Sequence, residues 1–405
     1  MIRFGRVRAL ATVAGVVWAG ACGGNQDAAP EAAASDSAGP TEARLLIDPA
    51  SVRVQEVFLL PDEAAARADL RQPRDLAIDD QGTLIVLDFA VPDHRQIVTF
   101  DPAGEFAIRF GELDERADRL GPSDQFAVMP WKYVMLVDAA DNALTSFLTL
   151  GTYVSTVTLA GVGMVVEPIP EYGHFYLKKW DPPRRRAYVL HMQLPVDSLS
   201  IVYQVTLPPG QSVRKDARDV SFLTASDGAG QLYVAFSDVY QVRVLDRQGA
   251  TVRVVQSPRR PVRKSPREIE EEHARLLEHL RGTVGDVSDS LLQDAARPDS
   301  LFPLIEELAV DPSGRLWVRT RRPEAAMGTV YDVFNDRGEQ ISWVSVPAVV
   351  RKTAFAPDGR LFVIDERDPA RPRVVGYEVG FGGSSDGGGV SRSGSAALPA
   401  AGTGR

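Results

Sequence analysis

Recurring pairs of glycine turns limit what this chain can fold into. Residues 75–111 show the unit most completely: four short apolar segments are separated by a loop and by turns at Gly82 and Gly104, which are 22 residues apart. The second segment, 84–87, has no polar residue and suits a strand covered on both faces, whereas 106–110 alternates as an edge strand does. The unit therefore predicts one sheet of four antiparallel strands.

Five more stretches repeat this unit. Two strong copies carry turn glycines 19 residues apart (Gly230 and Gly249) and 24 residues apart (Gly314 and Gly338). The six copies lie, in chain order, at 75–111, at 126–159, at 164–207, around 230–249, around 314–338 and at 353–380. Repetition at this spacing is typical of arrays of one structural unit, so the 405 residues do not require several separate domains.

The sixth copy lacks a strand, and the chain offers a spare one. The copy ends near Gly380 after three apolar segments, while the apolar segment 52–60 (VRVQEVFLL) precedes the first copy and has no sheet of its own. Pairing 52–60 with the last sheet would close a ring and cover an exposed edge. This arrangement resembles β-propellers, and 75–111 is similar to an NHL-type blade. The alternative is another array of antiparallel sheets.

The resemblance implies an all-β, six-bladed β-propeller whose N-terminal strand closes the last blade. One insertion, 257–304, lengthens the connection between blades 4 and 5, and Ser265 with Glu268 forms a capping box for a helix inside it. We expect four regions: a signal peptide (1–21), a disordered tether (22–42), the propeller (43–380) and a disordered Gly/Ser tail (381–405).

The amino terminus predicts export. Three arginines precede the apolar stretch 9–19, which is too short for a membrane span but suits a secretion signal. The following residues, 19–22 (AGAC), resemble a bacterial lipobox, which implies lipidation of Cys22; Gly23 in place of Asp implies transport to the outer membrane. The alternative is an ordinary secretion signal with an incidental cysteine. Because Cys22 is the only cysteine, no internal disulfide can form.

Charged residues at the start of the innermost strands are the first site candidates. In a propeller, the loops between second and third strands and the connections between blades emerge on one face, here called the loop face. Four residues were placed at this mouth of the central channel: Asp75, Asp219, Glu307 and Lys352. Resemblance to lactonase-like propellers implies a calcium site and hydrolysis there, although such carboxylates also commonly cap loops.

A second set of candidates is basic. The predicted loops of blade 3, the insertion and blade 5 concentrate cations, with one tryptophan among them, on one half of the loop face. These ligand-binding candidates are Lys178, Lys179, Trp180, Arg184, Arg185, Arg186, Arg259, Arg260, Arg321 and Arg322. A formal net charge of −9 argues against nucleic acid as a partner, so the pattern favours an anionic polysaccharide or envelope protein. The alternative is solvated loop charge.

Motifs of catalysis are missing from the sequence. It has no nucleophile elbow, no phosphate-binding glycine loop, and five histidines without ligand spacing. We therefore predict no catalytic residue, no metal site and no cofactor, and a lipid-anchored binding protein of the cell envelope rather than an enzyme. A lactonase-like hydrolase with a metal in the channel is the alternative.

Overall fold

The chain separates into two units, Met1–Thr41 and Glu42–Arg405, and the fold described below belongs to the second. The computed structural model describes residues 45–382 except 91–93, 112–125, 130–132, 139–142, 159–163, 172–173, 182–183, 194–198, 207–210, 213–219, 284–287 and 323–327. The signal peptide, the tether, Cys22, Asp219 and the tail beyond residue 382 therefore lie outside the described residues. None of the described helices combines the length and the apolar character of a membrane span.

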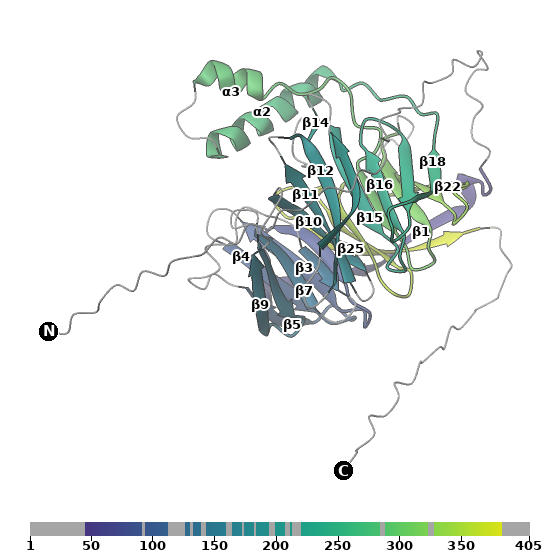
Figure 1. Ribbon diagram of the computed structural model, residues 1–405. Coiled ribbons are helices and arrows are strands. Elements are labelled where there is room, and N and C mark those ends of the chain that lie inside the picture. The colour runs from purple at the N-terminus through teal and green to yellow at the C-terminus, as the bar shows by residue number, and fades with distance from the viewer. Residues whose placement is uncertain are drawn as a thin grey trace, which may run out of the picture. The chain divides into compact units, whose positions relative to one another are not determined.

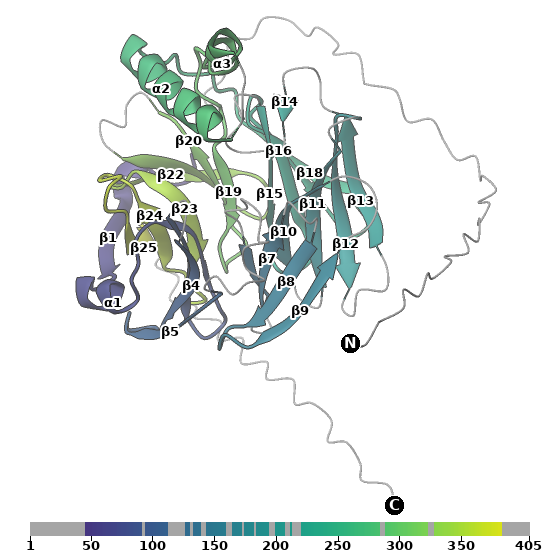
Figure 2. The ribbon, with the colours of Figure 1, turned by 90° about the vertical axis from the view of Figure 1, so that its left-hand side faces the viewer.

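Six antiparallel sheets form the predicted propeller (Figures 1 and 2). Blade 1 contains β2 (Pro73–Ile78), β3 (Leu84–Ala90), β4 (His94–Phe100) and β5 (Phe106–Phe110). Blade 2 contains β6 (Phe126–Met129), β7 (Tyr133–Asp138), β8 (Ala143–Leu148) and β9 (Tyr153–Thr158). Blade 3 contains β10 (Met164–Glu171), β11 (His174–Asp181), β12 (Arg186–Gln193) and β13 (Leu199–Thr206).

Blade 4 contains β15 (Val220–Ser226), β16 (Leu232–Phe236), β17 (Gln241–Leu245) and β18 (Thr251–Gln256). A two-residue strand that the sequence did not predict, β14 (Gln211–Ser212), adds to it in parallel with β15. Blade 5 contains β19 (Glu307–Val310), β20 (Leu316–Thr320), β21 (Thr329–Phe334) and β22 (Gln340–Val346). Blade 6 contains β23 (Val350–Phe355), β24 (Leu361–Asp365), β25 (Arg373–Phe381) and β1 (Val52–Leu59).

The first strand of each blade faces its counterparts in the neighbouring blades, in the circular order β2, β6, β10, β15, β19 and β23. Apolar clusters fill the seams between blades; one of them joins Trp317 and Tyr331 of blade 5 to Val363 and Tyr377 of blade 6. The second strands are buried on both faces, as β3 and β20 show, which explains their unbroken apolar runs.

Pairing of β1 with β25 confirms the predicted closure. The two strands are antiparallel, with Val52 opposite Phe381 and Leu59 opposite Val375. The chain also reaches the neighbouring blade before β1 begins, because the Ile47 amide donates to the Ile341 carbonyl of β22 at 2.8 Å. After a short 3-10 turn (Pro49–Ser51) and β1, a helix, α1 (Asp62–Arg67), leads into blade 1. One continuous segment therefore covers the outer edges of blades 5 and 6.

The turns between first and second strands form the opposite face, here called the turn face. In blade 1 the Asp79 carboxylate accepts hydrogen bonds from the amides of Gln81 and Thr83, both at Oδ1, and Gly82 has a φ of 81°. An aspartate that bonds its own turn and a glycine in the left-handed region explain why the pattern D-x-x-G recurs. Asp227 and Asp311 repeat this geometry in blades 4 and 5.

The predicted insertion holds two helices, α2 (Pro266–Thr283) and α3 (Asp289–Ala295), between β18 and β19. The capping box forms as expected, since the Ser265 amide donates to Glu268 Oε2 at 2.8 Å and the Glu268 amide donates to Ser265 Oγ at 3.3 Å. Lys264 anchors the insertion through an ion pair with Glu272 and through its own amide, which donates to the Ser300 carbonyl. Figures 1 and 2 show α2 and α3 side by side at one margin of the ring.

Candidate functional site

The charged residues at the loop-face mouth of the channel neutralise one another. Lys352 Nζ lies 3.3 Å from Asp75 Oδ1, across the junction of blades 6 and 1. Glu307 Oε2 lies 3.0 Å from Arg319 Nη1 and accepts a hydrogen bond from the Thr353 hydroxyl at 2.8 Å. Asp75, Glu307 and Arg319 are buried. These contacts join the innermost strands of three blades into one network of paired charges.

Arg319 is the centre of the network at the seam of blades 5 and 6. Its Nη1 donates to the Val350 carbonyl at 2.8 Å, and its Nε lies 3.4 Å from Glu306 Oε2. Burial opposes the charged form, but the two glutamates outweigh it, so the pKa of the Arg319 side chain is raised. A guanidinium that is fixed and permanently charged holds Glu307 in place.

These residues do not fit the calcium site that the hydrolase alternative requires. Of the mouth positions, one is the cation Lys352, and Glu307 already compensates Arg319. Asp219 lies outside the described residues; in blade 4 the residue whose register matches Asp75 is Leu223, which pairs with Ala235. Within the described part of the chain, no three His, Cys, Asp or Glu side chains cluster as a metal site would need. We derive no chemistry through a metal here.

Two of the predicted ligand-binding residues are buried rather than on a loop. Lys178 and Lys179 lie in β11 and are 4% and 1% exposed. Lys178 Nζ donates to the Phe222 carbonyl of blade 4 at 3.1 Å, while burial lowers the pKa of Lys179. Trp180 is half-buried against the apolar cluster between blades 3 and 4. The strand β11 continues four residues beyond its apolar run. The side chains of Lys178 and Trp180 therefore lie at the seam between blades 3 and 4.

Two predicted cations, Arg259 and Arg322, converge on one buried carboxylate. Asp332 in β21 is completely buried, and its Oδ1 lies 2.6 Å from Arg259 Nη2 and 2.8 Å from Arg322 Nη2. The same carboxylate accepts hydrogen bonds from the Tyr240 hydroxyl at 2.6 Å and from Gln340 Nε2 at 3.0 Å. This group, called the Asp332 clasp below, joins blade 4, the insertion and blade 5.

Burial and the neighbouring carboxylate raise the pKa of Tyr240 well above its ordinary value, so its hydroxyl stays a donor to Asp332. Tyr240 itself is buried, with 4% of its surface exposed. Sequence reasoning missed Asp332 itself. The sequence nevertheless contains a pattern that could have indicated it. Asp332 stands in the middle of the apolar strand TVYDVF, and a buried charge in such a strand needs partners from other parts of the chain.

The remaining predicted cations are exposed. Arg184 pairs with Asp181 at 2.8 Å, and Arg321 pairs with Glu306 at 3.0 Å while its guanidinium carbon lies 4.1 Å from the Phe302 ring centre. Arg185 adopts a positive φ of 50° in the turn before β12. Arg186 and Arg260, together with Arg263 of the insertion, are exposed, and their side chains form no hydrogen bond or ion pair to another described residue. Among the predicted cations and Arg263, these three are exposed and lack a close ion pair to a described residue.

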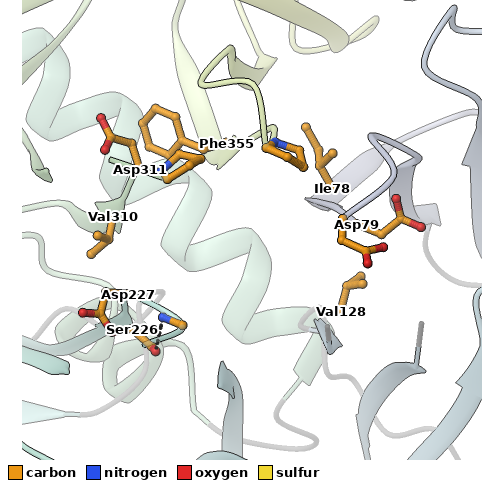
Figure 3. A pocket seen from close by; sticks show the side chains of 12 residues that line it. Ile78, Asp79, Val128, Ser226, Asp227, Val310, Asp311 and Phe355 are labelled. Atoms are coloured by element: carbon orange, nitrogen blue, oxygen red, sulfur yellow. Dashed lines mark hydrogen bonds between the residues drawn. The ribbon is translucent and has the colours of Figure 1, made fainter. Parts of the chain in front are cut away.

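A pocket of about 400 Å³ opens at the turn-face end of the channel (Figure 3). Figure 3 shows Asp79, Asp227 and Asp311 at separate points around it, with Ile78, Val128 and Phe355 between them. Each of these three aspartates is engaged by its own turn, and Asp311 Oδ2 also accepts from Trp317 Nε1 at 2.9 Å. The sequence analysis did not predict this pocket. Its three aspartates accept hydrogen bonds from the backbone of the turns in which they lie.

The carboxylates at the ends of the second strands are structural. Asp88 accepts hydrogen bonds from the amides of Arg71 and Gln72, and Asp365 accepts from the Val349 amide at 3.0 Å and from Arg367 Nε at 2.6 Å. Each holds the connection that enters its own blade.

Comparison with known proteins adds to the description of the fold. No family model matches the sequence, and no curated protein matches it either. Similar solved structures include a DUF4221-family protein from Bacteroides vulgatus, with 10% identity, a TM-score of 0.49, and coverage of 82% of this chain and 99% of that chain.

Two further neighbours have related architectures. The calcium-binding protein regucalcin from Agrobacterium tumefaciens has 13% identity, a TM-score of 0.44, and coverage of 83% of this chain and 96% of that chain. Streptogramin B lyase has 12% identity, a TM-score of 0.42, and coverage of 82% of this chain and 99% of that chain. At these identities and TM-scores the likeness carries no argument about this chain.

Proposed function

We propose that this protein is a lipid-anchored propeller of the cell envelope that binds an anionic polysaccharide through its loop face. The observation that carries the proposal is the set of three exposed arginines Arg186, Arg260 and Arg263, whose side chains form no hydrogen bond or close ion pair to another described residue, although Arg186 lies opposite Asp181 across the two strands. The three arginines emerge from the loop of blade 3 and from the insertion, on the same face. The aspartates of the D-x-x-G turns, in contrast, lie on the opposite face.

Binding of this kind depends on salt. Exposed cations within a Debye length of about 8 Å at physiological ionic strength reinforce one another's field, and an anionic polymer that contacts several of them releases its own counterions. Affinity should therefore fall as salt rises. An acidic envelope protein is the second outcome that the same surface allows, and a pull-down from native envelopes with and without polysaccharide-degrading enzymes separates the two.

The test compares two triple variants on a column carrying a sulfated polysaccharide at low salt. We expect the wild-type domain to be retained and Arg186→Ser, Arg260→Ser, Arg263→Ser to flow through with an unchanged melting temperature, because exposed charges contribute little to stability. The control, Arg53→Ser, Arg337→Ser, Arg360→Ser, removes the same charge near the turn face and should still be retained. Flow-through of the wild type, or equal retention of both variants, would contradict the proposal.

The anchor is tested separately. Cys22→Ser should release the protein in soluble form, because Cys22 is the only residue of the chain that the lipobox pattern offers for lipidation. If this variant still sediments with membranes after a salt wash, the lipoprotein assignment is wrong, whatever the column shows.

A further inference from the structure

The Asp332 clasp holds two guanidinium groups on one carboxylate. The Nη2 atoms of Arg259 and Arg322 lie 2.6 and 2.8 Å from the same oxygen, so they are no more than 5.4 Å apart, the sum of the two distances. One negative charge thus faces two positive charges. Among the described residues, Glu306 pairs with Arg319 and Arg321, and Glu272 pairs with Lys264, so these two carboxylates are already engaged elsewhere.

Both guanidiniums keep donors to spare. A guanidinium has five N–H groups, and each of these side chains donates to Asp332 from one nitrogen only, Nη2. Arg322 Nε is buried without a hydrogen-bond partner among the described residues. The side chains remain 17% and 18% exposed, so an anion can approach them from solvent.

The two groups are also held in position before any ligand arrives. The guanidinium carbon of Arg322 lies 4.9 Å from the Trp343 ring centre, and that of Arg259 lies 5.7 Å from the Tyr240 ring centre. Tyr240 and Gln340 fix the carboxylate that both arginines share. A ligand that binds here pays little for ordering the side chains, which favours affinity.

We propose that Arg259 and Arg322 form an oxyanion subsite at the loop-face end of the seam between blades 4 and 5. The subsite would take one carboxylate, sulfate or phosphate group of the bound polymer, whose oxygens match the fork of a guanidinium. An oxyanion that bridges the two arginines would balance two positive charges with two negative ones. This deepens the proposed function and rests on it, because it assigns one recognition point within the same anionic ligand.

The test replaces the fork but keeps the charge. In the double variant Arg259→Lys, Arg322→Lys, both ammonium groups can still pair with Asp332, whereas the planar donors are lost. We expect affinity for the polysaccharide to fall at least about tenfold, as loss of one charge-assisted hydrogen bond implies. The matched control is Arg351→Lys: this guanidinium pairs with Glu366 at 2.9 Å and donates to the Arg74 carbonyl, so its replacement should leave affinity unchanged.

Thermal shifts identify the group that binds. The melting temperature of the wild type should rise in phosphate, sulfate or glucuronate relative to chloride at equal ionic strength by more than that of the double variant, since sulfate and phosphate also stabilise proteins without binding to a site. The anion with the largest difference between wild type and variant identifies the group that binds. The double variant should lose the part of this rise that depends on the site. Should it fail to fold, Arg259→Lys alone decides, since it leaves the pair of Arg322 and Asp332 intact.

The outcomes separate the two proposals. A wild type that the polysaccharide column does not retain contradicts the proposed function. A retained wild type whose lysine variants bind equally well, with the same anion-dependent thermal shift, contradicts the subsite and leaves the proposed function standing.

Discussion

Phe58 holds the closing strand β1 against the first and last blades, and its removal should weaken the whole ring. Its ring centre lies 5.2 Å from that of Phe362 in β24, and it belongs to the apolar cluster shared by blades 1 and 6. It also leaves no space beside two glycines: a Cβ built on Gly104 or on Gly376 would lie 2.9 Å from the Phe58 side chain. The Phe58 side chain therefore fills the space between blade 1 and blade 6.

Truncating a fully buried phenylalanine to alanine costs about 3–5 kcal/mol, and Phe58 is only partly buried, so we expect Phe58→Ala to cost about 3 kcal/mol. For a domain of this size that lowers the melting temperature by roughly 5 °C. The adjacent Val57 lies at the irregularity in the pairing of β1 with β25, between Glu56 and Phe58, and is 41% exposed. Val57→Ala should therefore cost less than about 1 kcal/mol.

Urea denaturation followed by tryptophan fluorescence measures both variants on the soluble domain. The expected result is a lower midpoint for Phe58→Ala with an unchanged slope, because the surface exposed on unfolding stays nearly the same. Equal midpoints for Phe58→Ala and Val57→Ala would mean that β1 is not packed between blades 1 and 6, and would refute the closure as described.

Two further predictions concern buried polar groups. Tyr377→Phe should leave stability at pH 7 unchanged, because the buried Tyr377 hydroxyl has no hydrogen-bond partner among the described residues, whereas Tyr331→Phe should cost about 1 kcal/mol by removing the bond to Thr353. Burial raises the pKa of Tyr377 to about 12 from 10.0, so stability is unaffected by this group below pH 10 and falls as the pH rises through 12, because the unfolded chain loses the proton first. Tyr377→Phe removes this loss and should raise the alkaline midpoint of unfolding; an unchanged alkaline midpoint would contradict this. Asp332→Asn should lower the free energy of unfolding, measured by urea denaturation, by about 3–5 kcal/mol, because it leaves two guanidiniums uncompensated in a buried site. The control Asp358→Asn removes an exposed carboxylate and should lower it by less than about 1 kcal/mol. Similar losses in both variants would show that the clasp contributes no more than a surface ion pair.

Local rules were enough to predict the architecture. The turn at Gly82 is specified by one aspartate and one glycine within four residues, and the same rule holds in blades 4 and 5, at Asp227 with Gly230 and at Asp311 with Gly314. The helix α2 begins where Ser265 and Glu268 predict, since both partners of a capping box lie in one turn. The closure was also predictable, because a strand without a sheet and a sheet without a strand leave few other solutions.

The side-chain contacts across the seams could not be predicted in this way. Lys178 looked like a loop cation, yet its amine reaches the Phe222 carbonyl, 44 positions away in the next blade. A lysine can bury its long apolar stem, and whether it does depends on what the neighbouring blade presents. No pattern within blade 3 contains that information.

Asp332 shows how such contacts change a functional hypothesis. Tyr240 and Arg259, which bind Asp332, are 92 and 73 positions away from it in the sequence. From the sequence alone, Arg259 therefore could not be distinguished from the other basic residues of the predicted loops. In the structure these cations differ in their surroundings. Lys178 and Lys179 are buried, and Arg184 and Arg321 form ion pairs at the surface. Arg259 and Arg322 share the single carboxylate of Asp332. Only cations whose charge remains uncompensated attract an anionic ligand, because a paired charge must first lose its partner. Substitutions that pool all basic residues would therefore mix loss of folding with loss of binding, and the variants chosen above keep the two apart.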